Sequence, residues 1–156
     1  MYSKILVPLD RSELSQKAFQ QSLFIAQAFN AELQLLNVIS SSEAEYKDKV
    51  ALTGSGYYAR GVDESAQEKW QSTVESGLEP LESFVEEAAK VGVSAEFVRE
   101  IGQPEKQICK YAREWDIDLI VIGSHGRKGL NELLQGSVSN YVSHHVPCDV
   151  MLVHQK

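Results

Sequence analysis

Residues 118–129 read DLIVIGSHGRKG and join the clearest buried strand of the chain to a glycine-rich loop. The apolar run predicts a strand over 118–123, because uninterrupted runs of branched residues are typical of parallel strands covered on both faces. Gly123, Gly126 and Gly129 then punctuate the loop. Ligands of open parallel sheets bind beyond the carboxyl ends of the strands. The sequence therefore makes this loop the first candidate for a functional site.

Working outward from this stretch, strands and helices alternate along the whole chain. Further short apolar runs predict strands at 5–9, 32–39, 93–101 and 149–154. Apolar residues spaced three and four apart predict helices at about 14–29, 63–91, 104–115 and 137–145. The pattern predicts an α/β fold with an open five-stranded parallel sheet and helices on both faces. We expect one domain over residues 1–156, with a flexible insert at about 40–62.

Several helix boundaries are signalled by single residues. Ser12 or Asp10 can cap the first helix, whose apolar stripe runs to Phe29, and Asn30 is a plausible stop. Within the long second helix, Pro80 follows Gly77, which predicts a kink or short break near Gly77. Gly92 is the expected cap at its end.

Composition excludes some classes of function. The net charge of −7 over 156 residues lacks the basic footprint of a nucleic-acid-binding protein. The cysteines, Cys109 and Cys148, are not spaced for zinc and are expected to be reduced thiols. No apolar run suits a signal peptide or the ~20 residues of a membrane span. The expected compartment is the cytoplasm.

The glycine-rich loop has the chemistry of an anion site. Glycines allow backbone N–H groups to approach an oxyanion, and successive N–H groups form an anion-binding nest. A helix starting near Ser137 adds free donors and a hydroxyl, while Arg127 and Lys128 supply positive charge. The chain has no Walker A motif and no G-x-G-x-x-G after its first strand. Taken singly, Gly123 and Gly126 are equally well explained as ordinary turn glycines.

The spacing of these glycines resembles that of a known family. Gly123-x-x-Gly126, followed by nine residues and Gly136-Ser137, is similar to the G-2x-G-9x-G-[S/T] motif of ATP-binding universal stress proteins. The resemblance extends over essentially the whole chain. It includes KILVPLDRSELS near the start, GQPEKQICKYAREWDIDLIVIGSHGRKG in the middle and VPCDVMLV at the end. It implies strand order 3-2-1-4-5 and binding of ATP or a related adenine nucleotide, with Mg or Mn.

The resemblance also implies roles for individual residues. Pro8 would line the adenine pocket, the backbone at Val38 would meet the adenine edge, and Asp10 would lie near the ribose, the phosphates or their metal. Asp10 has the alternative of merely capping the first helix. Arg11 stands where the family often has glycine, and it could contact phosphate or crowd the turn. The ribose and phosphate cradle would consist of Gly123, Ser124, His125, Gly126, Arg127, Lys128, Gly129, Gly136, Ser137, Val138 and Ser139.

The function predicted from the sequence is regulatory or stress-responsive nucleotide binding. No catalytic residue is nominated, since a loop histidine such as His125 is more often a solvent or backbone contact, and at most slow ATP hydrolysis is expected. Two alternatives stay open: a scaffold protein with a vestigial pocket, and a relative of adenylyl-transferring enzymes. A homodimer is expected through the last strand, Val150–Val153, because an apolar edge strand needs a cover and because many members of the family dimerise there.

Overall fold

The computed structural model describes residues 1–10, 12–40, 79–124 and 137–154. It contains one five-stranded parallel sheet with the order β3-β2-β1-β4-β5, which confirms the predicted fold class and strand order. The described elements are β1 (Lys4–Pro8), α1 (Glu13–Phe29), β2 (Glu32–Ser40), α4 (Glu79–Lys90), β3 (Ala95–Gly102), α5 (Pro104–Glu114), β4 (Leu119–Ser124), α6 (Ser137–His145) and β5 (Asp149–His154).

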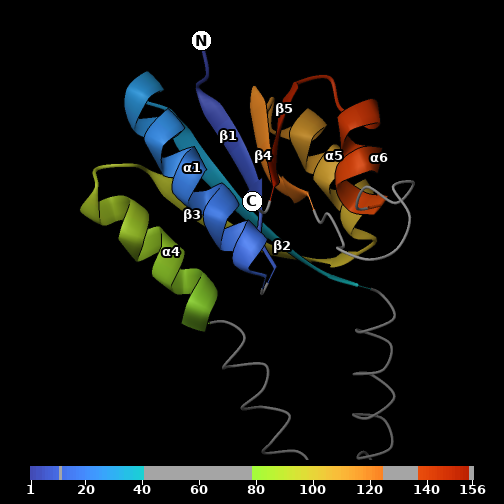
Figure 1. The fold of residues 1–156 in the computed structure, drawn as a ribbon, viewed down its shortest axis with the longest axis horizontal. Coiled ribbons are helices and arrows are strands. Elements are labelled where there is room, and N and C mark those ends of the chain that lie inside the picture. Colours follow the sequence, from blue (N-terminus) through green and yellow to red (C-terminus); the bar gives the residue numbers. More distant parts are fainter. Residues whose placement is uncertain (11, 41–78, 125–136, 155–156) are drawn as a thin grey trace, which may run out of the picture.

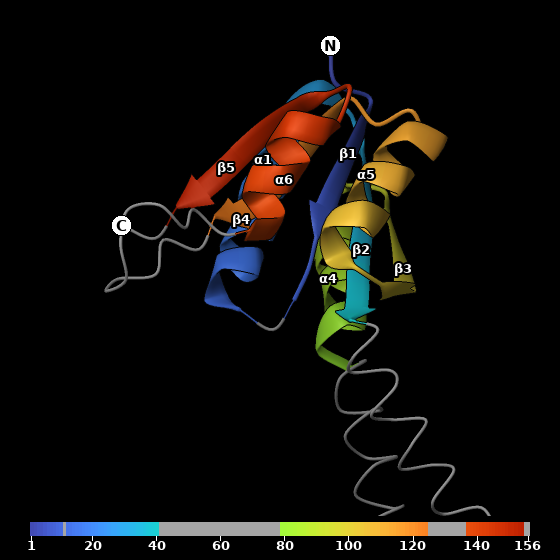
Figure 2. The same ribbon diagram turned by 90° about the vertical axis from the view of Figure 1, so that its right-hand side faces the viewer.

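The sheet lies between two layers of helices, with α1 and α4 on one face and α5 and α6 on the other (Figure 1 and Figure 2). Successive side chains of a strand point to opposite faces. Ile5 and Val7 of β1 therefore pack in the core beneath α1 and α4, whereas Leu6 packs in the core beneath α5. All three are fully buried. This double burial explains why the central strands β1 and β4 appear in the sequence as continuous apolar runs.

Residue 40, where the predicted insert begins, still belongs to β2, so the strand is longer than expected. The rest of the insert, the predicted helical segment at 63–78 and the kink near Gly77 lie outside the described residues. The third strand begins at Ala95, two residues later than predicted. The delay arises because the N–H of Val93 still donates to the carbonyl of Ala88, while Gly92 closes the helix with φ of 76°.

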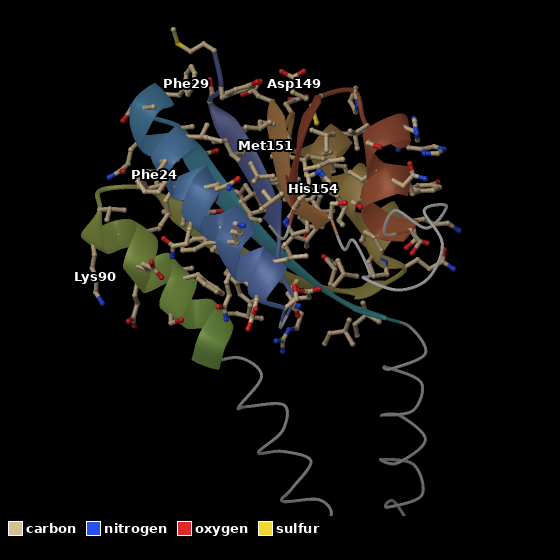
Figure 3. All side chains as sticks on the ribbon, in the orientation of Figure 1. Phe24, Phe29, Lys90, Asp149, Met151 and His154 are labelled. Carbon is tan, nitrogen blue, oxygen red and sulfur yellow. The ribbon has the colours of Figure 1, made fainter. Side chains whose placement is uncertain are left out.

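The end of α1 differs from the prediction in one respect. Asn30 is the C-cap as expected, in the left-handed conformation, with its N–H donating to the carbonyl of Ala26. Phe29 does not belong to the buried stripe, and 44% of its surface is exposed. The stripe ends at Ala26, and the Phe29 ring instead lies edge-on to the ring of Tyr2 at 5.2 Å. Figure 3 labels Phe29 at the end of α1 that lies next to the amino-terminal segment.

Asp118 ties the beginning of β1 to the segment before β4. Its Oδ2 atom accepts hydrogen bonds from the backbone N–H groups of Ser3 at 2.8 Å and Lys4 at 3.0 Å. These two donors favour the charged carboxylate and lower the pKa of Asp118 below its ordinary value. The bonds therefore hold the two central strands in register at their amino ends.

None of the helices in the described part of the chain combines the length and the apolarity that crossing a membrane requires.

Candidate functional site

A small cavity lies at the carboxyl end of the sheet, where the paths of the two central strands diverge. The chain leaves β1 to enter α1 on one face, and α6, which follows β4, lies on the other face. Strands β1 and β4 are neighbours, so this is the point at which the strand order reverses. Crevices at such switch points are the usual ligand sites of open α/β sheets. The cavity has a volume of about 170 Å³.

The lining of this cavity combines an apolar wall with a polar rim. The rim includes Asp10, Ser12 and Ser15, which come from the turn after β1 and the first turn of α1. The remaining lining residues are Pro8, Leu9, Leu36, Val38, Pro104, Ile108, Ile122, Gly123 and Val138. The structure thus brings Pro8, Asp10, Val38, Gly123 and Val138, all predicted from the sequence, to one place.

The turn after β1 is built around Asp10 and Ser12. Ser12, one of the two predicted candidates, is the N-cap of α1, and its Oγ atom accepts a hydrogen bond from the N–H of Ser15 at 3.2 Å. The Asp10 carboxylate supports this cap by accepting from the N–H of Ser12 at 2.8 Å and from the Ser12 hydroxyl. Asp10 is exposed and lies in the cavity lining, so supporting the cap does not remove it from the site.

A second set of hydrogen bonds reaches this turn from β2 and β3. The side-chain amide of Asn37 donates from Nδ2 to the carbonyl oxygen of Leu9 at 2.9 Å. The Asn37 Oδ1 atom accepts from Nε of Arg99 at 3.1 Å. Sequence reasoning missed both residues. The available signal was a polar amide in the carboxyl-terminal half of the run ELQLLNVI, directly after two leucines.

Gly123 has a packing role that the sequence did not reveal. A Cβ atom at this position would lie 3.0 Å from Cβ of Leu14, and 3.3 and 3.4 Å from the Leu14 backbone carbon and oxygen. The glycine therefore permits the close approach of α1 to β4. Ser124 follows as a buried residue of β4, paired with His154 of β5.

The predicted cradle is described only in part. Ser137, Val138 and Ser139 form the first turn of α6, where Ser137 is exposed, Val138 is half-buried and Ser139 is buried. The residues that lie outside the described part of the chain are Arg11, His125, Gly126, Arg127, Lys128, Gly129 and Gly136. Within the described ranges, no three His, Cys, Asp or Glu side chains gather as a metal site.

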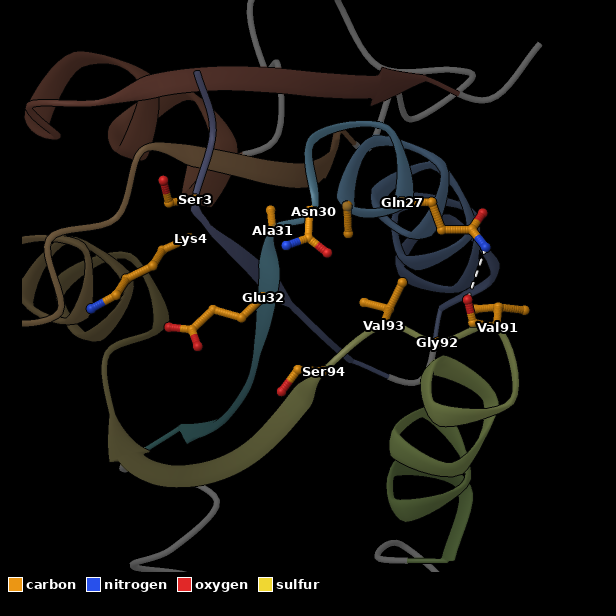
Figure 4. Close-up of a pocket in the computed structure, with 11 residues that line it drawn as sticks. Ser3, Lys4, Gln27, Asn30, Ala31, Glu32, Val91, Gly92, Val93 and Ser94 are labelled. Carbon is orange, nitrogen blue, oxygen red and sulfur yellow. Dashed lines mark hydrogen bonds between the residues drawn. The ribbon is translucent and has the colours of Figure 1, made fainter.

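A larger hollow of about 680 Å³ lies at the opposite, amino-terminal end of the sheet (Figure 4). It is lined by the last turn of α1, the turn after α4 and the beginnings of β1 and β2. Gln27 is among the lining residues, and its side chain donates to the carbonyl oxygen of Val91 at 3.0 Å. Two helices end here, and helix C-termini carry partial negative charge. The larger hollow is therefore a poor place for phosphate, in contrast to the smaller cavity.

Together, the parallel sheet and the cavity at its switch point define an α/β protein of the Rossmann-like class. A model of the universal stress protein family matches residues 1–154. The chain is 36% identical over 152 residues to the universal stress protein Sll1388 of Synechocystis sp., covering 97% of each chain. It is 38% identical over 154 residues to the universal stress protein YxiE of Bacillus subtilis, covering 98% of this chain and 99% of that one. The chain belongs to the universal stress protein family.

Solved structures show the same fold. The structure of MJ0577, a universal stress protein of Methanocaldococcus jannaschii, superposes with a TM-score of 0.76 at 28% identity, covering 100% of this chain and 98% of that one. A universal stress protein in complex with cAMP gives a TM-score of 0.65 at 23% identity, covering 98% and 97%. An Arabidopsis thaliana family member with AMP bound gives 0.64 at 22% identity, covering 99% and 92%. Because the last two structures are only 23% and 22% identical to this chain, their similarity shows a shared fold and nothing more.

Proposed function

We propose that this protein binds ATP or a closely related adenine nucleotide in the cavity between β1 and β4 and serves a regulatory role in the response to stress. One observation carries the proposal: Pro8, Asp10, Val38, Gly123 and Val138, separated widely in the sequence, line one cavity at the switch point of the sheet. Family structures with AMP and with cAMP bound support an adenine nucleotide as the ligand class.

The lining suggests how the nucleotide would be oriented. Pro8, Val38 and Val138 contribute to an apolar wall suited to a planar base, while Asp10 stands at the polar rim. A cavity of about 170 Å³ is smaller than the ~300–1,000 Å³ of typical ligand pockets, so it would hold the base end of a nucleotide. The phosphates would then extend toward the first turn of α6, whose N–H groups favour anions, and toward the predicted loop 123–129.

The residues present fit a metal ion that arrives with the nucleotide. The described lining contributes one carboxylate, Asp10, and Mg²⁺ in nucleotide sites is commonly held by one or two carboxylates together with the phosphates. Bound in this way, the ion would neutralise phosphate charge. Asp10 would be its protein ligand, held in place by the hydrogen bond from the N–H of Ser12.

A pair of matched substitutions tests the location of the site. Val38→Phe should fill the cavity and abolish ATP binding in calorimetric titration, because the larger ring would occupy the place of the base. Val91→Phe makes the same change in the larger hollow, at a side chain that is 43% exposed, and should leave the affinity unchanged. Equal affinity for ATP in Val38→Phe and the wild type would move the site elsewhere.

Three possible functions, namely nucleotide binding, a scaffold role and adenylyl transfer, can be distinguished by analysing the small molecules released from the purified, denatured protein and by assaying adenylate formation. Mass spectrometry detecting a retained adenine nucleotide supports binding, and no retained nucleotide together with no measurable ATP affinity supports a scaffold with a vestigial pocket. Formation of an acyl adenylate and pyrophosphate would instead indicate an adenylyl-transferring enzyme. The proposal concerns binding and assigns no catalytic residue.

We also propose a homodimer formed along β5 and a cytoplasmic setting. β5 is an edge strand, and Met151 in its middle is 37% exposed (Figure 3), whereas Val153 is buried. An apolar edge strand is normally covered in soluble proteins, and a two-fold copy would cover it. Both cysteines, Cys109 and Cys148, are free thiols, which agrees with a reducing compartment.

A further inference from the structure

The polypeptide leaves the sheet directly after Leu9, at the edge of the proposed site. The N–H of Leu9 donates to the carbonyl oxygen of Leu36 at 2.8 Å and so continues the ladder between β1 and β2 one residue beyond Pro8. The carbonyl of Leu9 then accepts from the side chain of Asn37, at 2.9 Å. A side chain of β2 thus holds the last peptide group before Asp10.

Arg99 decides which way the Asn37 amide faces. Asn37 and Arg99 are direct partners in the register of β2 and β3, and Arg99 donates from Nε to Oδ1 of Asn37. A guanidinium can only donate, and a backbone carbonyl can only accept. The amide oxygen must therefore face Arg99 and the amide nitrogen must face Leu9. The two partners leave one orientation for this amide and no equivalent flipped form.

The same turn is held from its other side by α1. The carbonyl oxygen of Asp10 accepts from the Ser15 hydroxyl at 2.8 Å, and the Asp10 carboxylate accepts from the N–H of Ser12. Leu9, Asp10, Ser12 and Ser15 all line the cavity, whereas Asn37 does not. The turn that forms the polar rim is therefore fixed between β2 and α1.

We infer that Asn37, oriented by Arg99, is a positioning residue of the nucleotide site: by holding the Leu9 carbonyl it sets the place of Asp10 at the rim of the cavity. This inference rests on the proposed function and adds a determinant of affinity that does not touch the ligand. Its chemical requirement is a hydrogen-bond donor directed at Leu9, which distinguishes it from a requirement for a side chain of a given size.

Asn37→Asp isolates this requirement, because aspartate has the shape of asparagine and keeps an acceptor for Arg99 but places an acceptor oxygen against the Leu9 carbonyl. Calorimetric titration with ATP and excess Mg²⁺ should show an affinity lower by roughly five- to tenfold, the effect of about one lost hydrogen bond. Asn37→Ala also removes the donor, without adding charge, and should show a similar loss.

Gln103→Glu is the matched control. It adds the same negative charge at an exposed residue next to Pro104 in the cavity lining, without touching the Asn37 hydrogen bonds. We expect it to bind ATP within about twofold of the wild type, since an exposed charge is surrounded by water, whose high dielectric weakens its repulsion of the phosphates. An equal loss of affinity in Asn37→Asp and Gln103→Glu would mean that charge alone is responsible and would overturn the inference.

A second readout does not depend on nucleotide binding. Hydrogen exchange of the Ser12 and Ser15 amides, followed by NMR without ATP, should be at least tenfold faster in both Asn37 variants than in the wild type. The amides of β4 should keep their protection, which shows that the variants remain folded. Wild-type protein that binds no ATP would refute the proposed function, and unchanged exchange at Ser12 and Ser15 would refute the positioning role.

Discussion

Gly123→Ala distinguishes two possible reasons for a glycine near the end of β4, which are the approach of a ligand and the close packing of α1. If the glycine serves only the approach of a ligand, alanine lowers ATP affinity and leaves the stability of the ligand-free protein unchanged. The structure predicts that stability falls as well, because the new Cβ would lie 3.0 Å from Cβ of Leu14 and 3.3 Å from its backbone carbon. Rotating a side chain does not relieve these contacts, so α1 itself must move by a few tenths of an ångström.

The size of the effect follows from two opposing contributions. Overpacking of this kind costs about 1–3 kcal/mol. Replacing glycine restricts the unfolded chain and recovers about 0.4–1 kcal/mol. The two ranges combine to a net loss of free energy of unfolding of about 1.3 kcal/mol at their centres, and the midpoint of thermal unfolding should fall by about 3–5 °C for a chain of this length.

Urea unfolding of nucleotide-free protein, monitored by circular dichroism, measures this loss. Gly92→Ala serves as a comparison, because a Cβ there meets nothing within 4 Å and any destabilisation comes from its φ of 76°. A separate calorimetric titration of Gly123→Ala with ATP shows whether the displaced helix also weakens binding, since Ser12 and Ser15 at the start of α1 line the cavity. Ligand-free Gly123→Ala protein as stable as the wild type would refute the packing argument.

Three further predictions follow from the contacts outside the cavity. Asp118→Ala should lower the free energy of unfolding by about 1–2 kcal/mol. This is near the lower limit for hydrogen bonds to a charged group, because the carboxylate is only half-buried. Folding lowers the pKa of Asp118, so its contribution to the free energy of unfolding is present above pH ~4 and is lost as the pH falls through the folded-state pKa. In urea unfolding, the difference in stability between the wild type and Asp118→Ala should therefore shrink below pH ~4. Met151→Lys should convert the proposed dimer to a folded monomer in sedimentation, and a monomeric wild type at micromolar concentration would contradict the dimer. Burial raises the pKa of the Cys148 thiol to about 11, so the native protein should react with a thiol reagent at pH 8 far more slowly than the urea-unfolded protein, and equal rates would show that the thiol is accessible.

Much of the fold could be predicted because the apolar residues of the sequence are the ones that the structure buries. Ile5, Leu6 and Val7 form an apolar run, and the structure buries all three between two helical layers. Asn30 and Gly92 mark helix ends because each adopts a positive φ. Phe29 was misassigned because helical spacing alone does not show where the sheet beneath a helix ends, and this ring lies against Tyr2 at the surface instead.

The site was predictable partly from the chemistry of the glycine-rich loop and partly from the family resemblance. Asp10 follows the end of β1 and Val38 lies near the end of β2; the family resemblance implied a role for both, and the topology brings both to the cavity. The packing role of Gly123 depends on the distance between α1 and β4, which no local pattern encodes. Asn37 and Arg99 are adjacent only through the register of β2 and β3, so their hydrogen bond required the structure.

Mapping of ATP onto the backbone amides by NMR tests the central claim most directly. Titration of nitrogen-labelled protein with ATP and Mg²⁺ should shift the amides of Asp10, Val38 and Val138, which come from the turn after β1, from β2 and from α6 around one cavity. The amides of Ala31 and Gly92 in the larger hollow should stay in place. Shifts confined to Ala31 and Gly92, or no shifts at millimolar ATP, would contradict the assignment of the nucleotide site to the cavity between β1 and β4.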